Sequence, residues 1–196
     1  MALNHRHFRR LVSRCAEIVA APGTSPLLVT VYRAAIEAPL RCYMDAAASV
    51  DRAMDRWKEA LAGRTRSLRR MDAPFRAGRS AVKAFYPWRI LPGTLKVQNT
   101  DTDKRLAIER LLEIVAAYRG EPWADAVLDG DIGRQAAVTV RCIDEAIEAA
   151  SALQQAQAAR ARVFAEAKRA FFAFKRVVRD ALGATSSAYR RLQIRS

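Results

Sequence analysis

Residues 161–182 read ARVFAEAKRAFFAFKRVVRDAL and carry the clearest structural pattern in the chain. Side chains that are apolar recur in two rows with a spacing of seven residues, as at the core positions of packed helices. The rows are Phe164, Phe171 and Val178, and Ala167, Phe174 and Ala181. Residues 68–85 repeat the pattern, with the rows Leu68, Phe75, Val82 and Met71, Gly78, Phe85. Both segments therefore predict the core of a helical bundle.

The same helical character extends over most of the chain. Residues 134–182 contain no Gly or Pro, and one unbroken helix of that length would measure about 73 Å. A hairpin with a turn near 156–163 is the alternative. Ala, Arg, Leu and Glu, which are good helix formers, dominate the longer segments. We therefore predict an all-α protein, an elongated bundle with long helices.

Two pairs of similar segments indicate an internal duplication. EIVAA occurs at 17–21 and 113–117, an offset of 96, and LRCYMDAA (40–47) resembles VRCIDEAI (140–147) at an offset of 100. The difference of four residues is about one helical turn, which a connecting loop can absorb. We predict copy one at 1–87, a linker at 88–103, and copy two at 104–196 with a long C-terminal helix and a basic tail. Chance matches between abundant residue types are the alternative explanation.

Turn and cap residues place the expected helices. In copy one they predict a helix over about 5–20. A second helix, with Ser25 as N-cap and Pro26 in its first turn, is expected to run to about Ala62, with a kink at Pro39. Gly63 is expected to end or bend it. A third helix is expected over about 66–86, where Pro74 allows a shorter helix capped by Asp72 as the alternative.

In copy two, Thr100, Asp101 or Thr102 is expected to cap a helix that runs to Tyr118. A short helical turn is expected around 123–128, between the breakers of the segment GEPWADAVLDGDIG (120–133).

The three cysteines, at positions 15, 42 and 142, are too few and too widely spaced for a disulfide framework or a zinc site. Each lies within an apolar helical pattern, so all three are expected to be buried thiols in a reducing compartment. The N-terminus has no apolar core of a signal peptide before Pro22. No stretch reaches the ~20 apolar residues of a spanning helix. The expected location is therefore cytoplasmic.

The charge is large and uneven. The formal net charge is +14, with +10 in residues 1–90, −4 in 91–155 and +8 in 156–196. This pattern favours a surface for a polyanion, or pairing between copies of the chain. A GC-rich bacterial genome that uses Arg freely is the competing explanation, since Arg outnumbers Lys by 28 to 6.

The two core rows are flanked by rows of cations that few acidic residues oppose. Ordinary exposed helix faces mix both signs of charge, because oppositely charged pairs stabilise a helix. Phe172 is apolar but lies outside the core rows. The predicted contacts are Arg66, Arg69, Arg70, Arg76, Arg79, Lys83, Arg162, Lys168, Arg169, Phe172, Lys175, Arg176 and Arg179. Arg69, Arg76, Arg79, Arg162, Arg169 and Arg176 are expected to contribute most.

Three partners suit such faces. An acidic protein surface, including a second copy of the chain, and DNA or RNA bound without sequence specificity are the two favoured classes. An anionic membrane surface is the third.

The sequence argues against an enzyme. The only histidines, His5 and His7, lie close to the N-terminus, and no phosphate-binding loop, dinucleotide fingerprint or nucleophile elbow is present. Carboxylate pairs such as Glu109 with Glu113 and Asp144 with Glu148 lack the histidines that di-metal bundles use. We predict a non-enzymatic binding or assembly protein without cofactor or metal site. An enzyme that uses carboxylates alone is the less favoured alternative.

Overall fold

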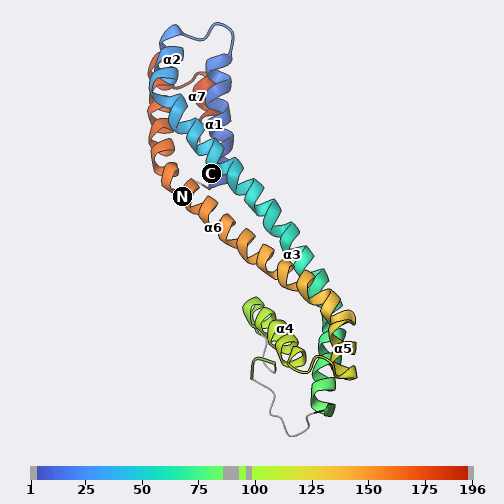
Figure 1. Ribbon diagram of the computed structural model, residues 1–196. Coiled ribbons are helices and arrows are strands. Elements are labelled where there is room, and N and C mark those ends of the chain that lie inside the picture. Colours follow the sequence, from blue (N-terminus) through green and yellow to red (C-terminus); the bar gives the residue numbers. More distant parts are fainter. Residues whose placement is uncertain (1–3, 86–92, 96–98, 194–196) are drawn as a thin grey trace. The chain divides into compact units, whose positions relative to one another are not determined.

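The computed structural model describes residues 4–85, 93–95 and 99–193, and every regular element in them is helical (Figure 1). The prediction of an all-α protein is confirmed. The elements are α1 (His5–Ala20), α2 (Pro26–Val31), a π-helical turn (Tyr32–Ile36), α3 (Glu37–Phe85), a 3₁₀ turn (Gly93–Leu95), α4 (Asp101–Ala116), α5 (Pro122–Leu128), α6 (Asp131–Leu182) and α7 (Ser187–Arg191). None of the helices in these ranges is long and apolar enough to cross a membrane.

The chain forms two compact units. Unit 1 comprises residues 1–53 with 153–196, and unit 2 comprises residues 54–152. Unit 1 contains α1, α2, the first part of α3, the last part of α6 and α7, whereas unit 2 contains the rest of α3, α4, α5 and the first part of α6. Each predicted copy thus contributes residues to both units. Residues 88–92 and 96–98 of the predicted linker lie outside the described residues.

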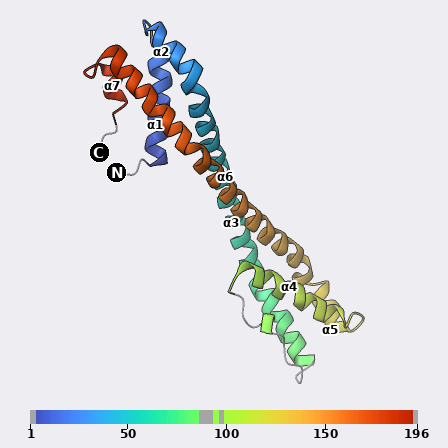
Figure 2. The same ribbon diagram turned by 90° about the vertical axis from the view of Figure 1, so that its left-hand side faces the viewer.

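Aromatic side chains fill the core of unit 1, where α1 packs against α3 and α6 (Figure 2). Phe8 meets Tyr43 and Phe171 edge to face, with ring centroids 4.9 and 5.7 Å apart. The predicted rows on α6 supply Ala167, Phe171, Phe174 and Val178, which are all fully buried, and Phe164, which is partly buried. Ala181 is exposed, contrary to the prediction, because α6 ends one residue later at Leu182, beyond the core.

In unit 2, α4 and α6 pack against the C-terminal part of α3. Met71, Phe75 and Val82 of α3 are buried, and Leu68 is partly buried. Gly78 allows close packing, since a Cβ there would lie 2.5 Å from Ile132 Cδ1. Phe85, placed in a core row by its spacing, is 50% exposed at the end of α3 and stacks on Trp123, with centroids 4.9 Å apart.

The boundaries of α3 differ from those expected for the helices of copy one. The helix continues through Gly63 and Pro74 without ending, so the predicted break and the alternative cap at Asp72 are both wrong. The buried side chains of α3 on both sides of Pro74 pack against α4 and α6, and this tertiary packing outweighs the local cost of a glycine and a proline. Before Pro39 the chain forms the π-helical turn, which widens the helix where the proline ring would otherwise meet the carbonyl of residue 35.

Other expected boundaries agree with the structure. Helix α1 has the predicted range, Ser25 and Pro26 begin α2, and α6 is one helix rather than a hairpin. Thr100 caps α4 in a reciprocal capping box with Asp103, and these hydrogen bonds hold the pKa of the Asp103 carboxyl below its usual value. Helix α4 ends at Ala116, two residues before the predicted end.

Burial follows the two offsets found in the sequence. At the offset of 96, four buried pairs join α1 to α4: Leu11 with Ala107, Val12 with Ile108, Cys15 with Leu111, and Ile18 with Ile114. At the offset of 100, between residues 32 and 82, the buried pairs are Tyr32 with Ile132, Ile36 with Ala136, Tyr43 with Ile143, Ser67 with Ala167, Met71 with Phe171, and Gly78 with Val178. Ala47 and Val82 are buried whereas their counterparts Ile147 and Leu182 are exposed. The change of offset falls between Ile114 and Ile132 in copy two. A duplication predicts this correspondence, and it stays a prediction.

The cysteines differ from the expectation of three buried thiols. Cys15 is buried in the core of unit 1, but Cys42 is exposed and Cys142 is half-buried. Cys42 lies on α3 next to Tyr43, and the neighbouring Tyr43 points into the core. Cys42 therefore falls on the outer side of that helix.

The three thiols are expected to react with a maleimide at different rates. Cys42 should be labelled within minutes, whereas Cys15 should react only after unfolding, because burial raises the pKa of its thiol to about 12. Mass spectrometry of peptides after timed labelling measures each rate. Equal rates for Cys15 and Cys42 in the folded protein would contradict this placement.

Candidate polyanion-binding faces

Helix α6 carries the first predicted face, in unit 1. Arg162, Lys168, Arg169 and Arg176 are exposed, and they lie beside the buried row that holds Phe171. Arg179 pairs with its neighbour Asp180, at 2.9 Å between Nε and Oδ1. Lys175 is half-buried, and its ammonium group lies 5.6 Å from the centre of the Tyr189 ring. The other four cations make no ion pair with any described residue.

Helix α3 carries the second predicted face, in unit 2. Arg66, Arg69, Arg70 and Lys83 are exposed and have no acidic partner within the described part of the chain. Arg76 pairs with Asp72 one turn away, at 2.5 Å. Arg79 is half-buried, its guanidinium lies 6.0 Å from the centre of the Phe75 ring, and its buried Nε has no hydrogen-bond partner.

The arginines of residues 101–152 behave differently. All five form ion pairs with carboxylates, namely Arg105, Arg110, Arg119, Arg134 and Arg141. Arg105 contacts both Glu109 and Asp144, so it links α4 to α6. In the stretch 153–182, by contrast, only Arg179 of five arginines has such a partner among the described residues. The protein therefore neutralises its arginines in one region and leaves them unpaired in another.

Phe172 stands out within the α6 face. Its side chain is 39% exposed, and its ring meets the buried Phe171 ring at a centroid distance of 5.4 Å. Lys168, Arg169, Lys175 and Arg176 are its neighbours on the helix surface, at three and four residues in either direction. The exposed aromatic side chain of Phe172 is thus surrounded on the helix surface by four cationic side chains.

The structure adds a hollow that the sequence does not reveal. A groove of about 360 Å³ lies between α3 and α4, next to the α3 face. Its lining residues are Leu68, Arg69, Met71, Asp72, Phe75, Lys104 and Ile108. Finding it required the packing of two helices that are about 30 residues apart in the chain, and no motif in either helix signals it.

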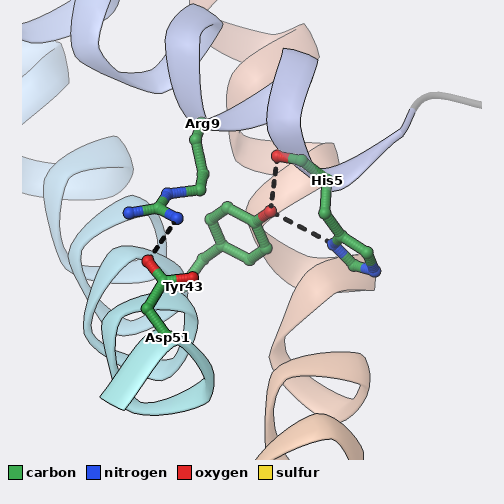
Figure 3. Close-up of polar contacts among 4 residues, drawn as sticks. All are labelled: His5, Arg9, Tyr43 and Asp51. Carbon is green, nitrogen blue, oxygen red and sulfur yellow. Dashed lines mark hydrogen bonds and ion pairs between the residues drawn. The ribbon is translucent and has the colours of Figure 1, made fainter. Parts of the chain in front are cut away.

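A polar cluster at the start of α1 was also not predicted (Figure 3). The Tyr43 hydroxyl donates to the His5 carbonyl oxygen at 3.2 Å and accepts from His5 Nδ1 at 3.1 Å, while Arg9 pairs with Asp51 at 2.6 Å. Burial, and then the nearby charge of Arg160, lower the pKa of His5 below its ordinary 6.5. These hydrogen bonds and the ion pair anchor α1 to α3.

Acidification is therefore expected to weaken unit 1. A histidine whose pKa is lower in the folded state binds protons more readily when unfolded, so stability is lost as the pH falls below about 6.5. The His5→Asn variant keeps an amide donor near Nδ1 but does not titrate. Between pH 7.5 and pH 5.5 the urea midpoint of unfolding should fall more for the native chain than for this variant. Parallel losses would show that His5 does not contribute.

Three of the four carboxylates considered for catalysis are engaged in ion pairs, and Glu148 has no such partner among the described residues. Glu109 and Asp144 both bind Arg105, and Glu113 binds Arg110. Among the residues that the structure describes, no group of three or more His, Cys, Asp or Glu side chains is placed to hold a metal ion.

Comparison with family models, with curated proteins and with solved structures gives no match.

Proposed function

We propose that the protein is a non-enzymatic binding protein that engages a polyanionic partner through the arginine-rich faces of α3 and α6. The unequal pairing of its arginines carries the proposal. A composition bias alone would place unpaired arginines on all surfaces, but those of residues 101–152 all have carboxylate partners. Outside that region, exposed arginines without an ion-pair partner among the described residues lie on α1, in the first half of α3 and on α7 as well as on the two faces. The row Arg162, Arg169 and Arg176 on α6 is distinguished by its seven-residue spacing.

The geometry of the faces suits a partner with repeated negative charge. Seven residues of helix span about 10.5 Å, so Arg162, Arg169 and Arg176 place three cations along about 21 Å. Each is exposed and needs to break no ion pair with a described residue before it binds. Cations in such rows neutralise phosphates or carboxylates without reading a sequence.

An acidic protein surface or nucleic acid supplies this charge. Purification without nuclease, followed by the 260/280 nm absorbance ratio, shows whether nucleic acid stays bound. Titration of a labelled random duplex from about 50 to 300 mM salt then measures the number of phosphates that are neutralised. A clean protein with no affinity for the duplex at low salt would leave an acidic protein as the partner. Heparin is a sulfated polyanion and serves as a general probe. A protein that binds neither the duplex nor heparin would contradict the proposal itself.

A further inference from the structure

Unit 2 contains a second, larger groove, between α4 and the first part of α6. It consists of two adjoining hollows of about 570 and 620 Å³ that share Glu109, Leu112 and Gly133. The apolar lining residues are Leu112, Ala116, Leu128, Ala136, Ala137 and Val140. Hollows of this size with an apolar lining accept large side chains or small ligands.

Carboxylates line this groove. They are Glu109, Glu113, Asp129, Asp144, Glu145 and Glu148, against the two guanidinium groups of Arg119 and Arg141. Arg105 and Arg110 pair with lining carboxylates from outside, so the six carboxylates face four guanidinium groups and the groove keeps a net negative charge although five of the six are ion-paired. Glu148 has no ion-pair partner in the described ranges. The groove is therefore an acidic site with an apolar floor, in a chain whose net charge is +14.

The α6 face has the complementary features. Phe172 is an exposed aromatic ring, and the four helix neighbours around it are all cations. A duplex backbone would be bound by the cations alone, and the ring could stack only on an unpaired base. The α6 face combines the apolar Phe172 with surrounding cations, and the groove combines an apolar floor with surrounding carboxylates. The two surfaces are therefore complementary, and opposite charge favours this pairing over others.

We propose that Phe172 of one copy of the chain, with Lys168, Arg169, Lys175 and Arg176, docks into the acidic groove of unit 2 in a second copy. The inference rests on the proposed function, because it names the partner of the α6 face. The groove and the α6 face are different surfaces of the chain. After one contact, the first copy therefore still has a free groove and the second copy still has a free Phe172. Association then either closes by a reciprocal contact or continues to longer assemblies.

A charge exchange between the two surfaces tests the docking. The groove variant carries Glu145→Lys and Glu148→Lys, and the face variant carries Lys168→Glu and Arg169→Glu. Sedimentation velocity at low salt should show association of the native chain and monomers of each variant alone. An equimolar mixture should associate again, because the native face of one variant meets the native groove of the other.

Two further variants separate docking from general charge effects. Asp55→Lys with Glu59→Lys makes the same change of charge on exposed residues of α3 outside the groove, and association should persist. Phe172→Ala should weaken association at least about tenfold, as expected for an aromatic anchor. Circular dichroism verifies that all variants are folded.

Three results would overturn the inference: a native chain that stays monomeric at low salt, a groove variant that associates like the native chain, or a mixture that remains monomeric. Heparin binding, measured on the same samples, keeps the two proposals apart. A monomeric native chain that still binds heparin removes the docking and leaves the proposed function. A native chain that does neither removes both.

Discussion

Replacing Gly133 with alanine is expected to destabilise the protein by about 3 kcal/mol or more, among the largest effects of a single methyl group. Gly133 lies in the first turn of α6, directly after the break that separates it from α5. A Cβ there would lie 1.6 Å from the carbonyl oxygen of Leu128 and 2.8 Å from its carbonyl carbon. These are backbone atoms, so no side-chain rotation relieves the clash and the junction between α5 and α6 must open.

Gly63 provides the matched control. It lies in the middle of α3, and an added Cβ would meet nothing within 4 Å. Alanine there should stabilise the protein by about 0.5–1 kcal/mol, because glycine loses more conformational freedom in a helix. Urea unfolding followed by circular dichroism measures both variants. Equal midpoints for Gly133→Ala and the native chain would show that this junction is packed differently.

Reversing three arginines on one face is expected to reduce the affinity for a heparin fragment at least about 100-fold at low salt. On α6 the variant is Arg162→Glu, Arg169→Glu and Arg176→Glu. On α3 it is Arg66→Glu, Arg69→Glu and Arg70→Glu, because Arg76 pairs with Asp72 and Arg79 packs over Phe75. These six side chains are exposed and unpaired among the described residues, so helix content should not change.

The control reverses the same number of charges elsewhere. Arg110, Arg119 and Arg134 are exposed but ion-paired, and their change to glutamate lowers the net charge by the same amount. If net charge alone governs binding, this control loses as much affinity as the face variants. We expect it to lose much less, since binding depends on the location of the cations.

Local pattern was sufficient to predict much of the fold. The seven-residue rows identified Phe171, Phe174 and Met71 as core residues, and the cap signals placed the starts of α2 and α4. The missing turn signal between 134 and 182 correctly predicted a single helix. These features depend on spacing and backbone chemistry within one segment, and a sequence displays both directly.

The failures share a physical cause. Gly63 and Pro74 lower the local preference for a helix, but packing of α3 against α4 and α6 outweighs it. Phe85 and Ala181 have core spacing yet are exposed at the ends of their helices, and the Phe85 ring is covered only in part, by Trp123 of α5. The division into units and both grooves depend on which helices pack together, and no single segment encodes that.

The candidate site was predictable only in part. Arginine spacing in the sequence predicts both faces, and the position of Phe172 outside the core rows is visible in the sequence as well. Four of the five paired arginines of residues 101–152 have a partner three or four residues away on their own helix, a spacing that the sequence displays. The pairs Arg105–Asp144 and Arg119–Asp129 depend on tertiary packing and were not visible.

The dependence of heparin affinity on salt tests the central claim most directly. For the native chain, the logarithm of the affinity should fall steeply and linearly with the logarithm of the salt concentration. The reason is that binding releases several salt counterions from heparin at once. Each face variant should show a clearly shallower slope, and the Arg110, Arg119 and Arg134 control should keep the native slope. Identical slopes and affinities for the native chain and both face variants would contradict the account.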